Sequence, residues 1–242
     1  MKQPKILLYD IETSPNLGYT WGKWQQNVLD FIKERELLCF SYKYVGSGKI
    51  RCISRKGDKS DLAVVAKLAK LINEADVSIA HNGDEFDRKV LKTRMLYWKL
   101  PPLRPGSTID TLKAAKAYFS FSGNSLDDLC RYLKIGRKMP TPGFSMWLGC
   151  MFGKKADWAK MVKYNKHDVS LLSEVYGRLK PWIENHPNMA RAMNPYGKEV
   201  GCPSCGSGNK HKNGFRVTAA LLKQVWKCNV CNRQWLAPLR KV

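Results

Sequence analysis

The chain has 242 residues, of which 44% are hydrophobic, so it can bury one sizeable core with a small appendage. Lys and Arg number 42 against 20 Asp and Glu, which gives a formal net charge of +22. This positive excess favours a polyanionic partner, most often nucleic acid. No apolar run approaches the length of about 18 residues that spans a bilayer, and the first residues do not resemble a secretory signal. We therefore expect a cytoplasmic protein without a membrane partner.

In chain order, apolar runs and turn residues predict a mixed α/β domain whose sheet is covered by helices. Strands are expected at residues 5–12, 37–45, 49–56 and 76–80, with a GSG turn joining the second and third. Helices are expected at residues 61–75, 84–98, 125–135 and 156–183, and Ser125 is a suitable N-cap for the third. Residues 136–155 are rich in Gly, Pro and Met and predict an irregular flap.

The charge distribution indicates two domains of unequal size. Residues 201–242 contain eight Lys or Arg and no Asp or Glu. Residues 184–200 interrupt the apolar periodicity with prolines and glycines, which is typical of a linker. We therefore predict a first domain at residues 1–183, a linker at 184–200 and a second domain at 201–242.

Three short stretches carry acids that could form one site. Alternate residues of a strand point the same way, so Asp10 and Glu12 project from one face at the end of the first strand. Two such carboxylates repel each other unless a cation lies between them, although two solvated acids at a strand end are an equal alternative. Asp87 follows an HNG turn, where an acid also suits the first turn of a helix, and Asp84 and Glu85 are close rivals.

The third stretch is KYNKHDV, in which Asp168 lies on a long predicted helix. Residues four apart share a helical face, whereas adjacent residues are turned about 100° from each other. Tyr164 can therefore reach the same site as Asp168, while His167 points elsewhere.

These stretches, YDIET, HNGDEFDRKVL and YNKHDV, resemble the motifs of the DEDD exonucleases of the ribonuclease H-like superfamily, in the same order. The resemblance covers residues 5–183, and residues 109–138 are similar to the connecting region of phage and bacterial members. One subtype has a histidine five positions before the last aspartate, where this chain has Lys163. The other subtype has a tyrosine four positions before the last aspartate, and this chain has Tyr164 at that position. The chain therefore resembles the tyrosine subtype of the proofreading enzymes.

The resemblance implies a ribonuclease H-like fold and a 3′→5′ exonuclease that hydrolyses DNA to nucleoside 5′-monophosphates. Asp10, Glu12, Asp87 and Asp168 would hold two Mg²⁺ or Mn²⁺ ions, and Tyr164 would orient the attacking water. Two alternatives are a structure-specific DNA endonuclease on the same fold and a nucleic-acid-binding or recruitment protein without turnover. A replication or repair role in a bacterium or a phage-infected cell is implied, with an unknown protein partner.

The C-terminal residues contain two C-x₂-C pairs, Cys202 with Cys205 and Cys228 with Cys231, separated by 22 residues. Two such pairs typically present four thiolates to one structural Zn²⁺, as in zinc ribbons of DNA-processing proteins. Gly206 and Asn232 follow the pairs, and both residue types adopt a left-handed backbone readily.

Further residues are candidates for nucleic-acid contact. His81 and Asn82 could line a substrate channel, although turn hydrogen bonds explain them at least as well. Asp110 could support the site from the edge of an IDTL strand. In the second domain, basic residues could meet phosphates, with DNA favoured over RNA: Lys210, Lys212, Arg216, Lys227 and Arg233.

Overall fold

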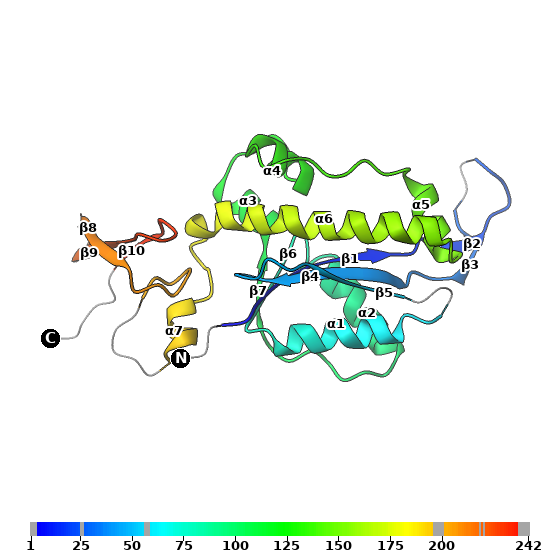
Figure 1. The fold of residues 1–242 in the computed structure, drawn as a ribbon, viewed down its shortest axis with the longest axis horizontal. Coiled ribbons are helices and arrows are strands. Elements are labelled where there is room, and N and C mark those ends of the chain that lie inside the picture. The colour runs from blue at the N-terminus through cyan, green and yellow to red at the C-terminus, as the bar shows by residue number, and fades with distance from the viewer. Residues whose placement is uncertain are drawn as a thin grey trace.

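A five-stranded mixed sheet forms the centre of the protein (Figure 1). The structure is a computed structural model that describes residues 4–24, 27–55, 59–195, 201–217, 219 and 221–236. The strand order is β5-β4-β1-β6-β7. The strands are β1 (Ile6–Thr13), β4 (Leu37–Tyr44), β5 (Arg51–Ser54), β6 (Val77–Ala80) and β7 (Ser107–Asp110).

The central strand, β1, pairs with an antiparallel and a parallel neighbour. It pairs with β4 in antiparallel register, with Asp10 opposite Ser41 and Glu12 opposite Cys39. On its other side it runs parallel to β6, and the described pairing ends at Leu8 opposite Ile79. The carboxyl-terminal half of β1 therefore extends beyond β6.

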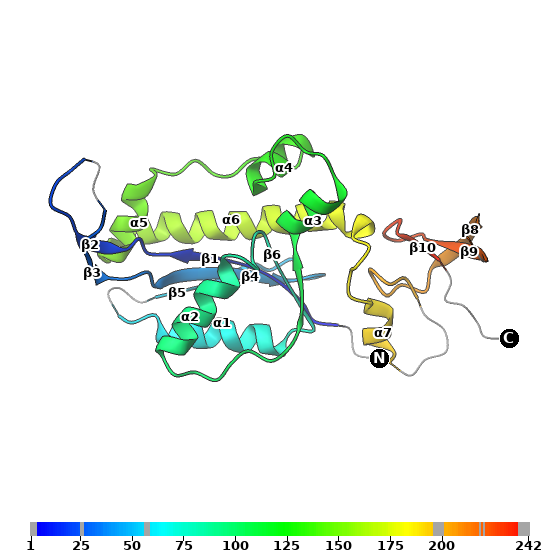
Figure 2. The same cartoon turned by 180° about the vertical axis from the view of Figure 1, so that it is seen from behind.

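Helices cover both faces of the sheet, as Figures 1 and 2 show. One face packs against α1 (Leu62–Glu74) and α2 (Asp87–Tyr97), and Leu7, Tyr9 and Ile11 of β1 point into that core. The other face packs against α3 (Thr111–Tyr118), α4 (Leu126–Tyr132) and the long α6 (Lys155–Leu179), to which β1 contributes Ile6 and Leu8. The alternation of β1 thus divides its residues between two apolar cores.

The structure confirms the predicted α/β class and the main predicted elements, and it contains further elements that were not predicted, among them α3. The predicted flap contains a helix, α5 (Phe144–Met151), because Met146, Cys150 and Met151 bury one face against the core. Between β1 and β4, a hairpin that was not predicted forms from β2 (Leu17–Tyr19) and β3 (Asp30–Lys33). Several of its large side chains are exposed, including Trp21 at 87%.

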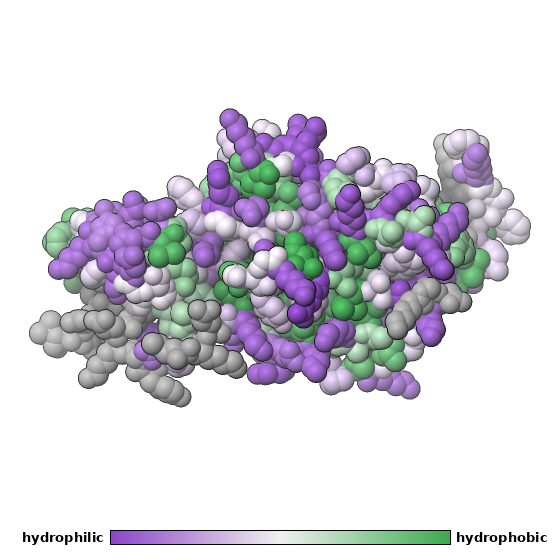
Figure 3. Space-filling view, in the orientation of Figure 1, coloured by the Kyte–Doolittle hydropathy of each residue, from purple (hydrophilic) through white to green (hydrophobic). Residues whose placement is uncertain are grey.

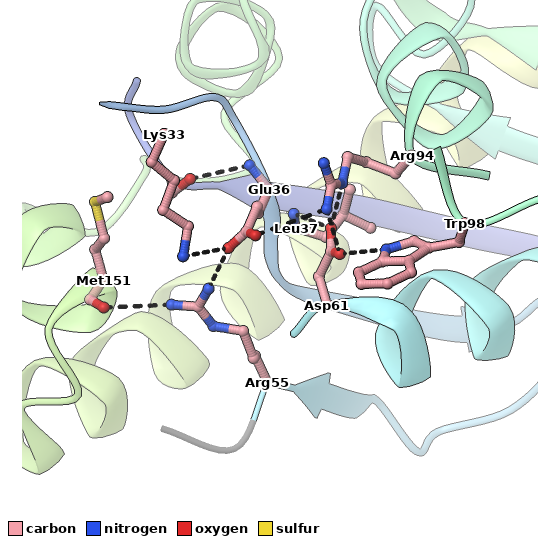
Figure 4. A network of polar contacts seen from close by, with 9 residues as sticks. Lys33, Glu36, Leu37, Arg55, Asp61, Arg94, Trp98 and Met151 are labelled. Carbon is pink, nitrogen blue, oxygen red and sulfur yellow. Dashed lines mark hydrogen bonds and ion pairs between the residues drawn. The ribbon is translucent and has the colours of Figure 1, made fainter. Parts of the chain in front are cut away.

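A buried ionic network ties the base of this hairpin to three helices (Figure 4). Arg94 of α2 donates two hydrogen bonds of 2.8 Å to the fully buried Asp61, which also accepts from the Trp98 indole and the Leu37 amide. Glu36 binds Arg55 at 2.6 Å, and Arg55 donates to the carbonyl of Met151 in α5. Because each buried charge has an opposite partner, the network fixes the segment that leads into β4.

The C-terminal module, defined here as residues 201–236, packs at the far end of α6. It contains a three-stranded sheet of β8 (Lys210–Val217), β9 (Leu222–Cys228) and β10 (Gln234–Leu236). The segment before it contains η1 (Lys180–Trp182) and α7 (Met189–Met193). The predicted linker at 184–200 is thus partly helical, and residues 196–200 lie outside the described residues.

Hydrogen bonds join the module to the main domain. The Arg233 guanidinium donates to the carbonyls of Pro181, Ile183 and Glu184 at 3.0, 3.0 and 3.3 Å. The Met189 amide donates to the carbonyl of Pro203 at 2.8 Å. In the part of the chain that the structure describes, no helix is long and apolar enough to cross a membrane.

Candidate functional site

Three carboxylates converge where β1 passes beneath α6. Asp10 and Glu12 alternate with the inward-facing Tyr9 and Ile11, so they project toward the α6 face. Asp168 comes from the buried face of α6. One ligand oxygen from each of the three residues lies within 4.8 Å of the others. The structure therefore brings together residues that are more than 150 positions apart in the sequence.

The Asp168 carboxylate is almost completely buried, with 1% of its side chain exposed. Its Oδ2 atom lies 2.7 Å from the Lys138 ammonium. Its Oδ1 atom is buried and has no hydrogen-bond partner among the described residues. A buried carboxylate oxygen without a donor is costly unless a cation or water satisfies it. Together with the oxygens of Asp10 and Glu12, this atom fits a hard divalent cation such as Mg²⁺ or Mn²⁺.

Burial and mutual repulsion raise the pKa values of the carboxyl groups in this cluster. Burial raises the pKa of Asp10 well above its usual value, and the charges of Glu12, Asp87 and Asp168 raise it further. Burial also raises the pKa of Glu12 to about 7, although the hydrogen bond from Trp147 opposes the shift. A bound cation would stabilise the ionised carboxylates and reverse these shifts.

Tyr164 lies one turn before Asp168, and Lys138 connects the two. The Lys138 ammonium donates to the Tyr164 hydroxyl at 3.1 Å and lies 5.3 Å from the centre of its ring. Burial raises the pKa of Tyr164 to about 12, so the phenol is protonated at neutral pH. His167 instead contacts the carbonyl of Arg137 at 2.9 Å, as expected for a residue turned away from the site.

Three residues that contact the acids or Tyr164 were not among the predicted catalytic or metal-binding residues. Asn165 is fully buried, and its amide donates to the carboxylate and the carbonyl of Asp10 at 2.7 and 3.2 Å. The Trp147 indole donates to Glu12 at 2.9 Å, and its ring meets Tyr164 edge to face at 5.9 Å. Lys138 is the third. Asn165 lies three residues before Asp168, so helical spacing could have indicated it, whereas Trp147 and Lys138 lie on segments without a matching period.

Asp87 lies beside the cluster but outside the group of three. Asp87 is buried, and its Oδ1 accepts the Ile11 amide at 3.2 Å at a place where β6 no longer pairs with β1. Burial raises the pKa of Asp87 to about 7. Its charge also raises the pKa of Asp10, so the two carboxylates repel each other electrostatically. The metal-ligand role of Asp87 stays a prediction.

The turn before Asp87 is held by local hydrogen bonds. Asp110 accepts the amides of Asn82 and Asp84 at 2.9 and 3.2 Å and also caps α3. The His81 ring contacts the Thr111 hydroxyl at 2.9 Å, and burial lowers the pKa of His81 to about 4. These bonds explain how His81 and Asn82 are positioned, and the contacts with nucleic acid stay predictions.

The four cysteines of the C-terminal module form a second cluster, with Sγ atoms within 4.8 Å of one another: Cys202, Cys205, Cys228 and Cys231. The Cys202–Cys231 and Cys205–Cys228 sulfur separations are 3.5 and 3.6 Å. Disulfide sulfurs lie about 2.05 Å apart, so these thiols are free. Four thiolates about 2.3 Å from a tetrahedral Zn²⁺ would lie about 3.8 Å apart, which the cluster fits closely. Gly206 and Asn232 adopt positive φ angles of 78° and 63°, as expected after each pair.

The basic residues of the module divide into two groups. Lys212 and Arg216 are exposed on β8, Lys210 lies 5.0 Å from the Trp226 ring centre, and Lys227 is half-buried on β9. Arg233 differs, because backbone carbonyls at the end of α6 already accept its guanidinium protons. The proposed phosphate contacts therefore rest on Lys210, Lys212, Arg216 and Lys227. A phosphate contact of Arg233 stays a prediction that no observation supports.

Residues 32–180 match a protein family described as the RNase H superfamily. The chain belongs to the RNase H superfamily. The matched range includes Asp87, Tyr164 and Asp168, and Asp10 and Glu12 precede it. The five-stranded mixed sheet flanked by helices is the fold of this superfamily, as the sequence predicted.

Two further similarities are to polymerases. A DNA polymerase III of the PolC type from Ureaplasma parvum serovar 3 is 26% identical over 130 residues, which are 52% of this chain and 9% of that protein. The structure of the family B DNA polymerase from the hyperthermophilic archaeon Pyrobaculum calidifontis superposes with a TM-score of 0.57 at 14% identity. That superposition covers 75% of this chain and 25% of the polymerase chain, and it concerns the fold alone. The chain thus spans a small part of each of these proteins.

Proposed function

We propose that this protein is a metal-dependent nuclease, and specifically a 3′→5′ exonuclease acting on DNA. The observation that carries the proposal is the convergence of Asp10, Glu12 and Asp168 within 4.8 Å, with an unsatisfied buried oxygen on Asp168. Such a cluster is unfavourable without a cation, and its ligands are those that Mg²⁺ and Mn²⁺ prefer. Sequence similarity to a segment of a protein named as a DNA polymerase supports DNA as the substrate.

In this proposal Asp10, Glu12 and Asp168, with Asp87 beside them, hold two divalent cations. When bound, these ions supply Lewis-acid activation of water and stabilise charge on the leaving 3′-oxygen. The Tyr164 hydroxyl, neutral at working pH, orients the attacking water toward the terminal phosphodiester. Trp147 and Asn165 keep Glu12 and Asp10 in place through their hydrogen bonds.

The C-terminal module is proposed to be a zinc ribbon that binds nucleic acid. Its four cysteine sulfurs have the spacing of a tetrahedral thiolate site, and it is too small and too basic to bury much apolar surface. A bound Zn²⁺ would therefore contribute most of its folding free energy. Lys210, Lys212, Arg216 and Lys227 would supply the contacts with phosphates.

One assay separates this function from its alternatives. The full chain is incubated with Mg²⁺ or Mn²⁺ and with single-stranded, duplex and branched DNA labelled at the 3′ or the 5′ end. Stepwise release of mononucleotides from the 3′ end supports the exonuclease. Discrete internal cuts would identify a structure-specific endonuclease instead. A mobility shift without cleavage would identify a binding or recruitment protein.

The variant Asp10→Ala tests the metal assignment directly. We expect at least a thousand-fold loss of cleavage, on the order of the effect of removing one essential group from a catalytic site. In EDTA we expect an unchanged or higher melting temperature, because one of several repelling carboxylates is removed. Glu174→Gln is the control, since Glu174 is an exposed acid on α6 outside the cluster. Substantial cleavage by Asp10→Ala would overturn the assignment.

A further inference from the structure

Two adjacent pockets lie on α4 and the turn that follows it, next to the proposed catalytic site. The first, the basic pocket, is lined by Arg131, Lys134, Ile135, Gly136 and Arg137. The second, the aromatic pocket, is lined by Phe121, Ser122, Gly123, Asp128, Arg131 and Tyr132. Both are open to solvent, with volumes of about 510 and 340 Å³, as suits an extended chain that lies along a surface. Arg131 lines both, so the pockets adjoin at this residue.

The basic pocket concentrates positive charge without acids in its lining. Arg131, Lys134 and Arg137 are exposed, and none of the three forms an ion pair with a described residue. Lys134 has a φ angle of 55°, and the Ile135 amide bonds back to the Cys130 carbonyl at 2.9 Å. This left-handed turn at the end of α4 places Lys134 and Arg137 beside Arg131. Three convergent cations suit a phosphodiester.

The turn also connects the basic pocket to the carboxylate cluster. Arg137 is followed by Lys138, whose ammonium lies 2.7 Å from Asp168. The Lys138 amide donates to Asp127 of α4 at 2.8 Å, and the Arg137 carbonyl accepts from His167 of α6. The turn is therefore fixed to both helices. A polynucleotide whose end lies at Asp168 therefore has the basic pocket one residue along the chain from Lys138.

The aromatic pocket has different chemistry. Asp128 in its wall bonds to Ser125, which keeps the pKa of this carboxyl low, so the pocket repels phosphate. Tyr132 is 70% exposed and meets Phe121 edge to face at 5.1 Å. An exposed ring beside a basic pocket suits a stacked nucleobase, because stacking is worth about 1 to 3 kcal/mol per base.

Ring contacts continue from this pocket toward the C-terminal module. Phe121 lies 5.2 Å from Phe119, and Phe119 lies 5.8 Å from Trp182, which is 61% exposed. Trp182 adjoins Pro181, whose carbonyl accepts from Arg233 of the module. We call Tyr132, Phe121, Phe119 and Trp182 the aromatic row. Figure 1 shows α4 above α6, between the α5 end of that helix and the module, and Figure 3 shows hydrophilic side chains over α4 and over the module.

We propose that the basic pocket and the aromatic row form the path of a single-stranded polynucleotide between the carboxylate cluster and the C-terminal module. Phosphodiesters occupy the basic pocket, and bases stack on Tyr132 and Trp182. A single strand fits because its unpaired bases can reach the rings. The inference rests on the proposed nuclease function for the direction of the strand, and it adds the substrate class and its route. It predicts that upstream nucleotides contribute to binding.

The test compares two double variants of the full chain. Tyr132→Ala with Lys134→Glu alters the path, and Tyr97→Ala with Lys92→Glu makes the same chemical changes at exposed positions of α2, on the opposite face of the sheet. Fluorescein-labelled oligo(dT) of about twelve and about three nucleotides is bound in buffer without Mg²⁺, Mn²⁺ or chelator, so that zinc is not removed from the module, and binding is followed by anisotropy. We expect the dissociation constant of the longer oligonucleotide to rise at least tenfold in the path variant only, with a salt slope lower by about one. The shorter oligonucleotide should bind both variants equally.

Equal affinity of the two variants for the longer oligonucleotide would overturn the path. Because binding is measured without Mg²⁺ or Mn²⁺, a path confirmed without any cleavage in Mg²⁺ would remove the nuclease function and keep the path. Intact cleavage, together with equal affinities of the two variants for the longer oligonucleotide, would keep the nuclease function and remove the path. If the path variant fails to fold, photocrosslinking of 5-bromodeoxyuridine oligonucleotides to the unaltered chain gives the same answer. Crosslinks at Tyr132 or Trp182 support the path, and crosslinks confined to the β2–β3 hairpin or the module contradict it.

Discussion

The Lys138 ammonium lies 2.7 Å from Asp168 and donates to Tyr164 at 3.1 Å, so one cation bridges the two α6 residues of the carboxylate cluster. The sequence places Lys138 thirty positions before Asp168, with α5 between them. Burial acts to lower the pKa of Lys138, but the contacts with Asp168 and Tyr164 raise it above its usual value. The ammonium is therefore charged, and it offsets part of the repulsion among the acids.

Replacing this cation should destabilise the metal-free protein. For Lys138→Met we expect the free energy of unfolding in EDTA to fall by about 1 to 3 kcal/mol, because the buried Asp168 loses its charged partner. The partial exposure of Lys138 to solvent places the effect in the lower part of this range. The difference should shrink in saturating Mg²⁺, since a divalent cation supplies the missing charge. Urea unfolding with and without Mg²⁺ measures both effects.

The matched control is Lys163→Met, since Lys163 is exposed on the same helix as Asp168. It should leave the free energy of unfolding within about 0.5 kcal/mol of the unaltered chain. If Lys138→Met also left the free energy of unfolding in EDTA unchanged, the contact between Lys138 and Asp168 would contribute nothing to stability.

Trp147 should control metal affinity through Glu12. Trp147→Phe keeps a ring against Tyr164 but removes the indole that donates to Glu12 at 2.9 Å. We expect metal affinity to fall by about 10- to 100-fold, as for other residues that orient ligands. Titration with Mn²⁺ by calorimetry measures it. Trp158→Phe is a close control, because the Trp158 indole nitrogen is buried with no partner among the described residues. Equal Mn²⁺ affinities in the two variants would exclude the positioning role.

Stability and metal affinity should both depend on pH. The pKa of Glu12 rises from 4.5 to about 7 in the folded chain, and that of Asp10 also rises. Between these values the folded protein binds protons that the unfolded chain has released. The free energy of unfolding in EDTA should therefore fall as pH rises from about 4.5 to 7.

Mg²⁺ competes with the same protons. Its apparent affinity should thus increase toward pH 7 by up to tenfold per pH unit for each proton displaced. Melting temperatures measured with EDTA and with Mg²⁺ at several pH values check this. The difference between the two melting temperatures should widen as pH rises. A gap that is constant between pH 5 and 8 would mean that the acids are ionised throughout.

Removing one cysteine of the second cluster should unfold the C-terminal module but not the main domain. For Cys205→Ser we expect the loss of about one equivalent of zinc and rapid proteolysis within residues 201–236, because the metal supplies most of the folding free energy there. The melting temperature of the main domain should change little, since it has its own cores. Elemental analysis and limited proteolysis provide the measurements.

Cys52→Ser is the control for this variant, because Cys52 lies on β5 in the main domain and outside the four-cysteine cluster. It should retain zinc and the protease resistance of the module. Full zinc content in Cys205→Ser would show that this thiolate is not a ligand.

The sequence by itself determined which residues face the same way within one element. Alternation along a strand pairs Asp10 with Glu12, a helical turn pairs Tyr164 with Asp168, and two C-x₂-C pairs indicate one metal site. The 3.6-residue and two-residue periods are local, so they are readable without a structure. The turn residues Gly206 and Asn232 followed from backbone preference in the same way.

Only the tertiary structure decided which elements meet. It brought β1 beneath α6, placed Lys138 and Trp147 against the acids, and left Asp87 beside the end of β6, bound to the Ile11 amide. It also turned the expected flap into α5 and anchored the β2–β3 hairpin through Glu36 and Arg55. These contacts join residues far apart in the chain, and they form because buried charges need partners and apolar faces need cover. A local pattern carries no record of such partners, so the complete site exists only in the folded chain.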